Sequence, residues 1–199
     1  MSHVERECKR ADAVTNRARL LEVALAAFAQ SGLDLEVNDI AARAQVGVGT
    51  LYRHFGNREE LLRAIISESV EDALAQIRLA IEPYTDNPRA ALQALVSAGL
   101  RVQQQYRSVF VVIRDPRLAR LFDPVRREAL RTQFVDLISG VIERGARSGI
   151  FRDGLDYELV AATIIGSFTG VFEILGKHYP LTELEQRLSQ LLWTMVARA

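Results

Sequence analysis

Apolar residues recur at helical spacing along almost the whole chain. In the first predicted helix, over about 13–30, Leu21, Leu25 and Phe28 lie three or four positions apart and form one apolar stripe. Gly32, just beyond the last periodic residue, would end this helix in a left-handed conformation. The alternation of apolar and polar residues that marks a half-buried strand is absent. The pattern therefore predicts an all-α protein with about nine helices.

Two short helices are predicted next, over about 37–44 and 48–55, with a tight turn between them. Ile40, Leu51 and Phe55 are spaced to pack the two helices against each other. A helix-turn-helix holds its recognition helix in this way and presents the outer residues to the major groove of DNA. The outer face of the second helix carries Val48, Gly49, Thr50, Tyr52, Arg53 and His54.

Capping residues divide the rest of the chain into longer helices. Glu60 follows Asn57 by three positions and a proline follows Asn87, so each asparagine predicts a helix start. Thr182 and Glu185 have the spacing of a capping box and predict the start of the last helix. These helices are predicted over about 57–81, from 88 onward, and over about 124–148, 156–175 and 182–198.

The last two predicted helices indicate a homodimer. The helix over 156–175 is apolar on almost every side, whereas a helix on the surface of a monomer would have a polar face. Its small residues recur every four positions, where another backbone could approach closely. Two such helices from each chain would bury these surfaces as a four-helix bundle; alternatively, both helices complete the core of one chain. The predicted dimer interface comprises Ala162, Gly166, Gly170, Leu184, Leu188, Leu191 and Met195.

The charge balance restricts where nucleic acid could bind. The whole chain holds 25 basic and 25 acidic residues, so any such site must be a local patch. Residues 37–58 hold three arginines against one aspartate, a net charge of +2, whereas residues 1–60 hold eight cations and nine anions. The tail over 1–13 mixes both signs of charge and is expected to be a flexible arm.

Other features indicate a soluble protein of the cytoplasm. Cys8 is the single cysteine, which excludes an intramolecular disulfide and suits a reducing compartment. The first residues are charged and lack the apolar core of a signal peptide. The uncharged stretch over 159–172 is shorter than the roughly 20 apolar residues of a membrane span, so no membrane partner is expected.

Catalytic constellations are also missing from the sequence. The three histidines lie far apart, and there is no phosphate-binding Gly-rich loop or nucleophile motif. We therefore expect no enzymatic activity, no metal ion and no cofactor. A helical adaptor that binds only protein is the alternative, but it would not explain the exposed polar residues of the second short helix.

The run from Asp39 to Leu62, DIAARAQVGVGTLYRHFGNREELL, resembles the tetracycline-repressor-like (TetR) family of transcriptional regulators. The resemblance extends over roughly residues 16–67. It implies a helix-turn-helix DNA-binding domain over 14–67 and a helical domain for effector binding and dimerisation over 68–199. It also implies a DNA-binding repressor that a small-molecule effector releases from a palindromic double-stranded operator.

The resemblance assigns roles to individual residues. Thr50, Tyr52 and Arg58 would contact phosphates, and Arg43 would reach a base or a phosphate. The residues facing the groove would be Val48, Gly49, Arg53 and His54. Two positions depart from the family pattern: Gln45 lies where the turn usually has glycine, and Gly47 replaces the usual Ser or Thr cap.

The effector site implied by the resemblance would lie among aromatic side chains of the C-terminal helices. Ligand pockets are mostly apolar with a few polar groups, so an apolar or aromatic effector is expected. Ordinary core packing is the competing explanation for each aromatic residue taken singly. The candidate lining residues are Tyr106, Phe110, Phe134, Phe168 and Phe172.

Overall fold

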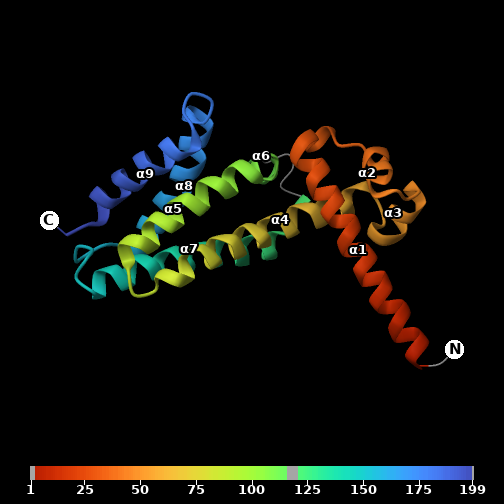
Figure 1. Cartoon of the computed structure of the whole chain (residues 1–199), viewed down its shortest axis with the longest axis horizontal. Helices are drawn as coiled ribbons and strands as arrows, with labels where there is room; N and C mark the ends of the chain where they lie inside the picture. Colours follow the sequence, from red (N-terminus) through yellow and green to blue (C-terminus); the bar gives the residue numbers. More distant parts are fainter. Residues whose placement is uncertain (1–2, 116–120, 199) are drawn as a thin grey trace. The chain divides into compact units, whose positions relative to one another are not determined.

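The computed structural model describes the backbone of residues 3–115 and 121–198, and the side chains from residue 16 onward apart from Leu33. Over these residues the protein is all-α, as predicted, with nine α-helices, two short 3-10 turns and one isolated bridge between Phe151 and Ala197 (Figure 1). The helices are α1 (His3–Ser31), α2 (Val37–Ala44), α3 (Val48–Phe55), α4 (Arg58–Ile81), α5 (Pro88–Gln105), α6 (Arg107–Arg114), α7 (Pro124–Arg147), α8 (Tyr157–Leu175) and α9 (Leu181–Val196). The 3-10 turns are η1 (Gly32–Asp34) and η2 (Glu82–Tyr84).

The structure assigns α1 an earlier start than the predicted residue 13. The arm predicted over 1–13, including Cys8, lies outside the residues whose side chains are described and stays a prediction. At the other end of α1, Gly32 has a φ of +57° and ends the helix as expected.

The chain divides into two compact units. The first unit contains the residues up to Ser69 together with 108–122, and the second contains 70–107 together with 123–199. The described residues 108–115, 121 and 122 therefore pack with the N-terminal unit, although the sequence placed them in the C-terminal domain. This segment belongs to the first unit because its apolar side chains are buried in the core of that unit. They are Val109, Val112, Leu121 and Phe122.

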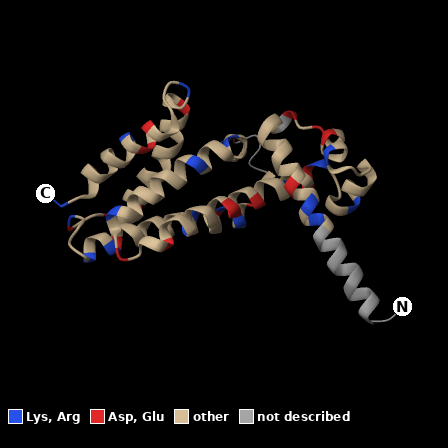
Figure 2. Ribbon diagram, viewed as in Figure 1, with Lys and Arg blue, Asp and Glu red and all other residues tan. Residues whose placement is uncertain are grey.

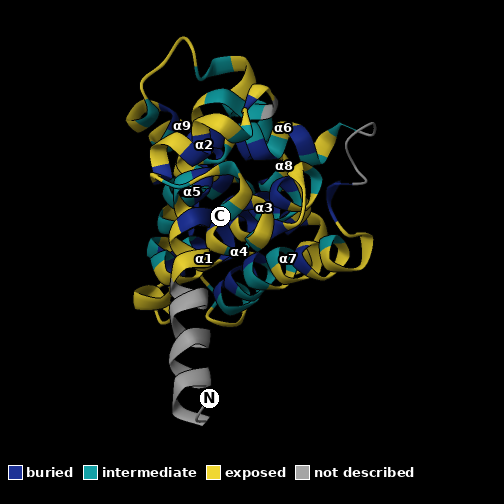
Figure 3. Cartoon of the chain, turned by 90° about the vertical axis from the view of Figure 1, so that its right-hand side faces the viewer, coloured by how far each residue is buried: buried dark blue, intermediate teal, exposed yellow. Residues whose placement is uncertain are grey.

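Each unit has its own apolar core. Figure 3 colours the buried residues dark blue. The core of the first unit is built from Leu20, Ala24 and Phe28 of α1, Ile40 of α2, Leu51 of α3, and Ile65 and Ile66 of α4. In the second unit α5 packs against α7, α8 and α9. Gly99 of α5 permits a close approach there, because a Cβ at this position would lie 2.4 Å from the ring of Phe168.

Helix starts follow the predicted caps in two of three cases. The Oδ1 atoms of Asn57 and Asn87 accept the N–H groups of Glu60 and Ala90 at 2.9 and 3.1 Å. The capping box predicted at Thr182 is wrong, because α9 already begins at Leu181 after Pro180. The partner expected for that box, Glu185, instead accepts hydrogen bonds from two residues of α5, Ser97 Oγ at 2.6 Å and Arg101 Nε at 3.2 Å.

Candidate nucleic-acid interface

The turn between α2 and α3 is built almost entirely by backbone groups. Gln45 adopts a left-handed conformation with φ 56° and ψ 43°, as expected from its place in the turn. The N–H groups of Gln45 and Val46 bond to the carbonyls of Ala42 and Ala41 at 3.1 and 3.0 Å. Gly47 then begins α3 without a side-chain cap, and its carbonyl accepts the N–H of Thr50 at 2.9 Å. Backbone hydrogen bonds thus hold the turn, and Gln45 is strained there because a left-handed conformation is unfavourable for a residue other than glycine.

Packing against α2 decides which face of α3 is free. Ile40, Leu51 and Phe55 are buried, as predicted, and the guanidinium of Arg17 lies over the Phe55 ring at 5.0 Å. The opposite face of α3 points away from the core: Gly49, Tyr52 and Arg53 are exposed, and Val48, Thr50 and His54 are half-buried. All six residues proposed to face DNA are therefore accessible on one short helix.

The first turn of α3 offers bare backbone. A Cβ added at Gly47 or Gly49 would meet no atom within 4 Å. The N-terminus of a helix carries partial positive charge and unpaired N–H groups, which attract anions such as phosphate. This turn can therefore approach a DNA strand more closely than a turn that carries larger side chains.

Three of the predicted contact residues lie at one hollow. Val48, Tyr52 and Arg58 line a cavity of about 430 Å³ together with residues of η1 and the start of α2. Arg58 also donates from Nη2 to the carbonyl of Leu35 at 3.4 Å. Asn38 lines the same hollow and is exposed. Asn38 lies in the first turn of α2 and was not among the residues predicted to contact DNA.

Arg43 lies apart from this hollow, at the end of α2. It is exposed, and its Nη1 donates to Oε1 of Gln30 on α1 at 2.9 Å. Figure 2 shows basic positions on α2 and α3, and acidic positions close to them in the same unit. The excess of basic residues is therefore local to the segment over 37–58, which has a net charge of +2.

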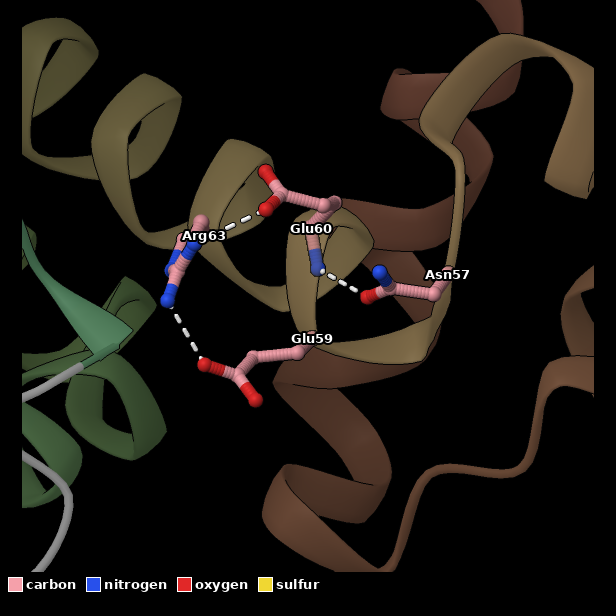
Figure 4. Close-up of polar contacts among 4 residues, drawn as sticks. All are labelled: Asn57, Glu59, Glu60 and Arg63. Atoms are coloured by element: carbon pink, nitrogen blue, oxygen red, sulfur yellow. Dashed lines mark hydrogen bonds and ion pairs between the residues drawn. The ribbon is translucent and has the colours of Figure 1, made fainter.

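Two acidic residues, Glu59 and Glu60, lie in the first turn of α4 and are paired with an arginine of the same helix (Figure 4). Arg63 donates from Nη2 to Glu59 Oε1 at 2.6 Å and from Nη1 to Glu60 Oε1 at 2.8 Å. Paired carboxylates repel phosphate less than free ones do. This role of Arg63 was not predicted from the sequence, although a spacing of three and four residues from the glutamates indicates such ion pairs on a helix.

A second surface, on α8, is apolar and uncovered. We call the row formed by Leu159, Ala162, Gly166, Gly170 and Ile174 the α8 strip. Leu159 is 64% exposed and Ile174 is 71% exposed, and a Cβ at either glycine would meet nothing within 4 Å. Contiguous apolar surface left in water is the kind of surface that another protein surface covers.

Two residues predicted for the dimer interface lie elsewhere. Leu184 and Leu188 are 2% and 3% exposed, because their stripe faces the protomer's own core, where α9 packs on α5. The expectation that they contact a partner is therefore wrong. Leu191 is 65% exposed and Met195 is half-buried, so both remain accessible to one.

By length and composition, α8 could also cross a membrane. Its most apolar window has a mean hydropathy of 1.6, and 22% of that window is buried. The uncharged stretch over 159–172 is shorter than this helix, and its length alone predicted no membrane span. Core and interface helices of water-soluble bundles have the same composition, so this feature alone is weak evidence for a membrane.

The five aromatic residues predicted for an effector site do not all belong to one unit. Phe110 lies in the first unit and the other four lie in the second. Phe168 is buried, Phe134 and Phe172 are half-buried, and the Tyr106 hydroxyl donates to Asp72. A hollow of about 520 Å³ between α5 and α9 is lined by none of them; it contains Trp193, with the Arg89 guanidinium 4.6 Å from the ring centre.

Metal binding finds no support within residues 16–115 and 121–198. No three His, Cys, Asp or Glu side chains in that part of the chain lie close enough together to hold an ion.

Comparison with known proteins identifies the relatives of this fold. The family described as "Bacterial regulatory proteins, tetR family" matches residues 20–65. The HTH-type transcriptional repressor KstR2 of Rhodococcus jostii is 32% identical over 147 residues, which are 72% of this chain and 71% of the relative. The HTH-type transcriptional activator FasR of Mycolicibacterium smegmatis is 32% identical over 129 residues, 62% of this chain and 58% of the relative. The solved structure of the ketosteroid transcriptional regulator KstR2 of Mycobacterium tuberculosis has a TM-score of 0.60 at 27% identity, covering 92% of this chain and 95% of that one.

Proposed function

The chain belongs to the tetR family of bacterial regulatory proteins, and on that premise we propose that it is a transcriptional repressor. As a homodimer it binds a palindromic DNA operator, and a small apolar effector releases it. The observation that carries the proposal is the outward face of α3, held by the buried Leu51 and Phe55 against the core of the first unit.

DNA binding divides into phosphate contacts and base contacts. Tyr52 and Arg58, which line one hollow, contact the phosphate backbone together with Thr50. Arg53 is exposed on α3 and is the strongest base-reading group there, since an arginine can donate two hydrogen bonds to guanine. The remaining groove-facing residues are Val48, Gly49 and His54, with Arg43 at the edge.

Dimerisation uses the α8 strip and the exposed flank of α9. The apolar area at Leu159, Ile174 and Leu191 would otherwise stay in water. Gly166 lets the partner's backbone approach closely. A two-fold dimer also presents two recognition helices to successive major grooves, about 34–36 Å apart on one side of the duplex.

Effector binding belongs to the aromatic residues of the second unit. Phe168, Phe134 and Phe172 lie on the packed helices α7 and α8. The related KstR2 of Mycobacterium tuberculosis is described as a ketosteroid transcriptional regulator, which supports an apolar effector. Binding would favour a conformation in which the spacing of the two recognition helices no longer matches the operator.

An activator is the second candidate. FasR is named an activator, but it matches a smaller share of this chain than the KstR2 repressors do, and repression is therefore favoured. Either role requires DNA binding in the cytoplasm, and the proposal contains no catalytic step.

Selection of bound duplexes from a random pool tests the proposal. A palindromic consensus with half-sites about one helical turn apart is expected from a two-fold dimer. A reporter placed behind the selected site then separates repression from activation. Recovery of no preferred sequence, or of a single asymmetric half-site, would contradict the proposed mode of binding.

A further inference from the structure

Gln103, in the last turns of α5, is a buried polar side chain with half of its amide unused. It is 4% exposed. Its Oε1 accepts a hydrogen bond from the Thr169 hydroxyl on α8 at 3.4 Å. Its Nε2 has no hydrogen-bond partner among the residues that the structure describes.

The stability of the fold does not explain this amide. A buried donor without a partner loses its hydrogen bonds to water and gains none in return, which destabilises the folded state. Methionine has nearly the same length and shape and would fill the position at no such cost. Buried polar groups without partners are few in proteins, and each one calls for a specific explanation.

Gln103 lies where α5 packs against α8, close to aromatic residues of α8. Gly99, one turn earlier in α5, lies against the Phe168 ring. Thr169, which orients the Gln103 amide, directly follows Phe168 on α8, and Phe172 lies one turn further along. Small-molecule pockets commonly combine apolar and aromatic side chains with a few polar groups that fix the orientation of the ligand.

We propose that Gln103 is the polar contact of the effector site and donates from Nε2 to a neutral acceptor oxygen, such as a ketone carbonyl, on an otherwise apolar effector. The inference rests on the proposed function and adds the chemical class of the effector. The Thr169 hydroxyl occupies the acceptor end of the amide, so the donor end is the one that selects the ligand. A carboxylate fits this site less well, since burying a charge requires a charged or multiply hydrogen-bonded partner.

The first test needs no ligand. Gln103→Met removes the unpaired donor, so the melting temperature of the full chain should rise by a few degrees. Gln104→Met, on the exposed side of the same turn, is the matched control and should leave it unchanged. A lower melting temperature for Gln103→Met would mean that the amide is already satisfied within the folded protein, and would overturn the inference.

The second test compares two ligands of nearly the same shape, 2-decalone and 2-methylenedecalin. The second carries a methylene group in place of the carbonyl oxygen of the first. The wild-type chain should bind the ketone at least about 10-fold more tightly. The ketone supplies an acceptor to the buried Nε2, which more than offsets the lost hydration of the carbonyl, whereas the methylene compound leaves Nε2 without a partner. In Gln103→Met the preference should vanish or reverse, while Gln104→Met keeps it. Equal affinity for both compounds in the wild type, binding of neither, or an unchanged preference in Gln103→Met would refute the role of Gln103.

Operator binding distinguishes this failure from a failure of the proposed function. Ligand-free Gln103→Met should bind the selected operator as tightly as the wild type, since the residue lies in the second unit. If the wild type binds no operator, the proposed function fails on its own evidence. If operator binding is intact and the ketone preference is absent, only the inference about Gln103 fails.

Discussion

Leu188 and Leu191 lie three residues apart on α9, yet their substitution should have different consequences. Leu188 is 3% exposed and Leu191 is 65% exposed in the protomer. Complete burial of a leucine contributes about 1.5–3 kcal/mol, so the part of Leu191 left for a partner to cover corresponds to about 1–2 kcal/mol. A two-fold interface contains the residue twice, which gives about 2–4 kcal/mol per dimer.

Leu191→Ala should therefore raise the dimer dissociation constant about 30- to 700-fold, at about 1.4 kcal/mol for each factor of ten. Sedimentation equilibrium over a concentration series measures this constant. Leu188→Ala is the matched control: it should lower the free energy of unfolding by about 2–5 kcal/mol through a cavity in the core. Gly166→Glu, which places a charge on the α8 strip, should give folded monomers with weak operator affinity.

Two results would contradict the proposed dimer interface. A wild-type chain that is monomeric at micromolar concentration would refute the dimer and the palindromic mode of binding. A dimer whose dissociation constant changes less than two-fold in Leu191→Ala would show that its interface lies away from the exposed flank of α9.

Three further predictions concern the DNA surface and the fold. Tyr52→Phe and Arg58→Ala should weaken binding to all duplexes. Arg58→Ala should also reduce the slope of log affinity against log salt concentration by about one. Arg53→Ala should change the preferred sequence, with a loss of about 1–3 kcal/mol of binding free energy at the original site. Binding titrations at several salt concentrations check these effects, and unchanged preference in Arg53→Ala would exclude it as a base contact. Gln45→Gly should stabilise the chain to urea by about 0.5–1 kcal/mol, because relief of the left-handed strain exceeds the added flexibility of the unfolded chain; no gain would mean that the turn is unstrained. Gly99→Ala should destabilise the chain by at least about 1–3 kcal/mol, because the new methyl would overlap an aromatic ring at 2.4 Å, and a melting temperature equal to that of the wild type would contradict that close approach.

The local elements of this protein could be predicted from short stretches of its sequence. The bounds of α2 and α3, the cap at Asn57 and the left-handed Gly32 follow from residues within one or two turns of each other. The TetR resemblance over roughly 16–67 has the same local character, since the helix-turn-helix is a short continuous segment. Helical periodicity and capping chemistry act over such distances, and they are readable without knowledge of the fold.

Which apolar faces are core and which are surface depends on how whole helices pack, and could not be predicted from the sequence. Periodicity placed Leu188 and Leu191 on one helix but could not tell that α5 covers the first and leaves the second exposed. The same holds for Glu185, which bonds to α5 rather than capping its own helix, and for the unpaired amide of Gln103. In each case the partner lies tens of residues away, and its position is set by the packing of whole helices, which a local pattern of side chains does not encode.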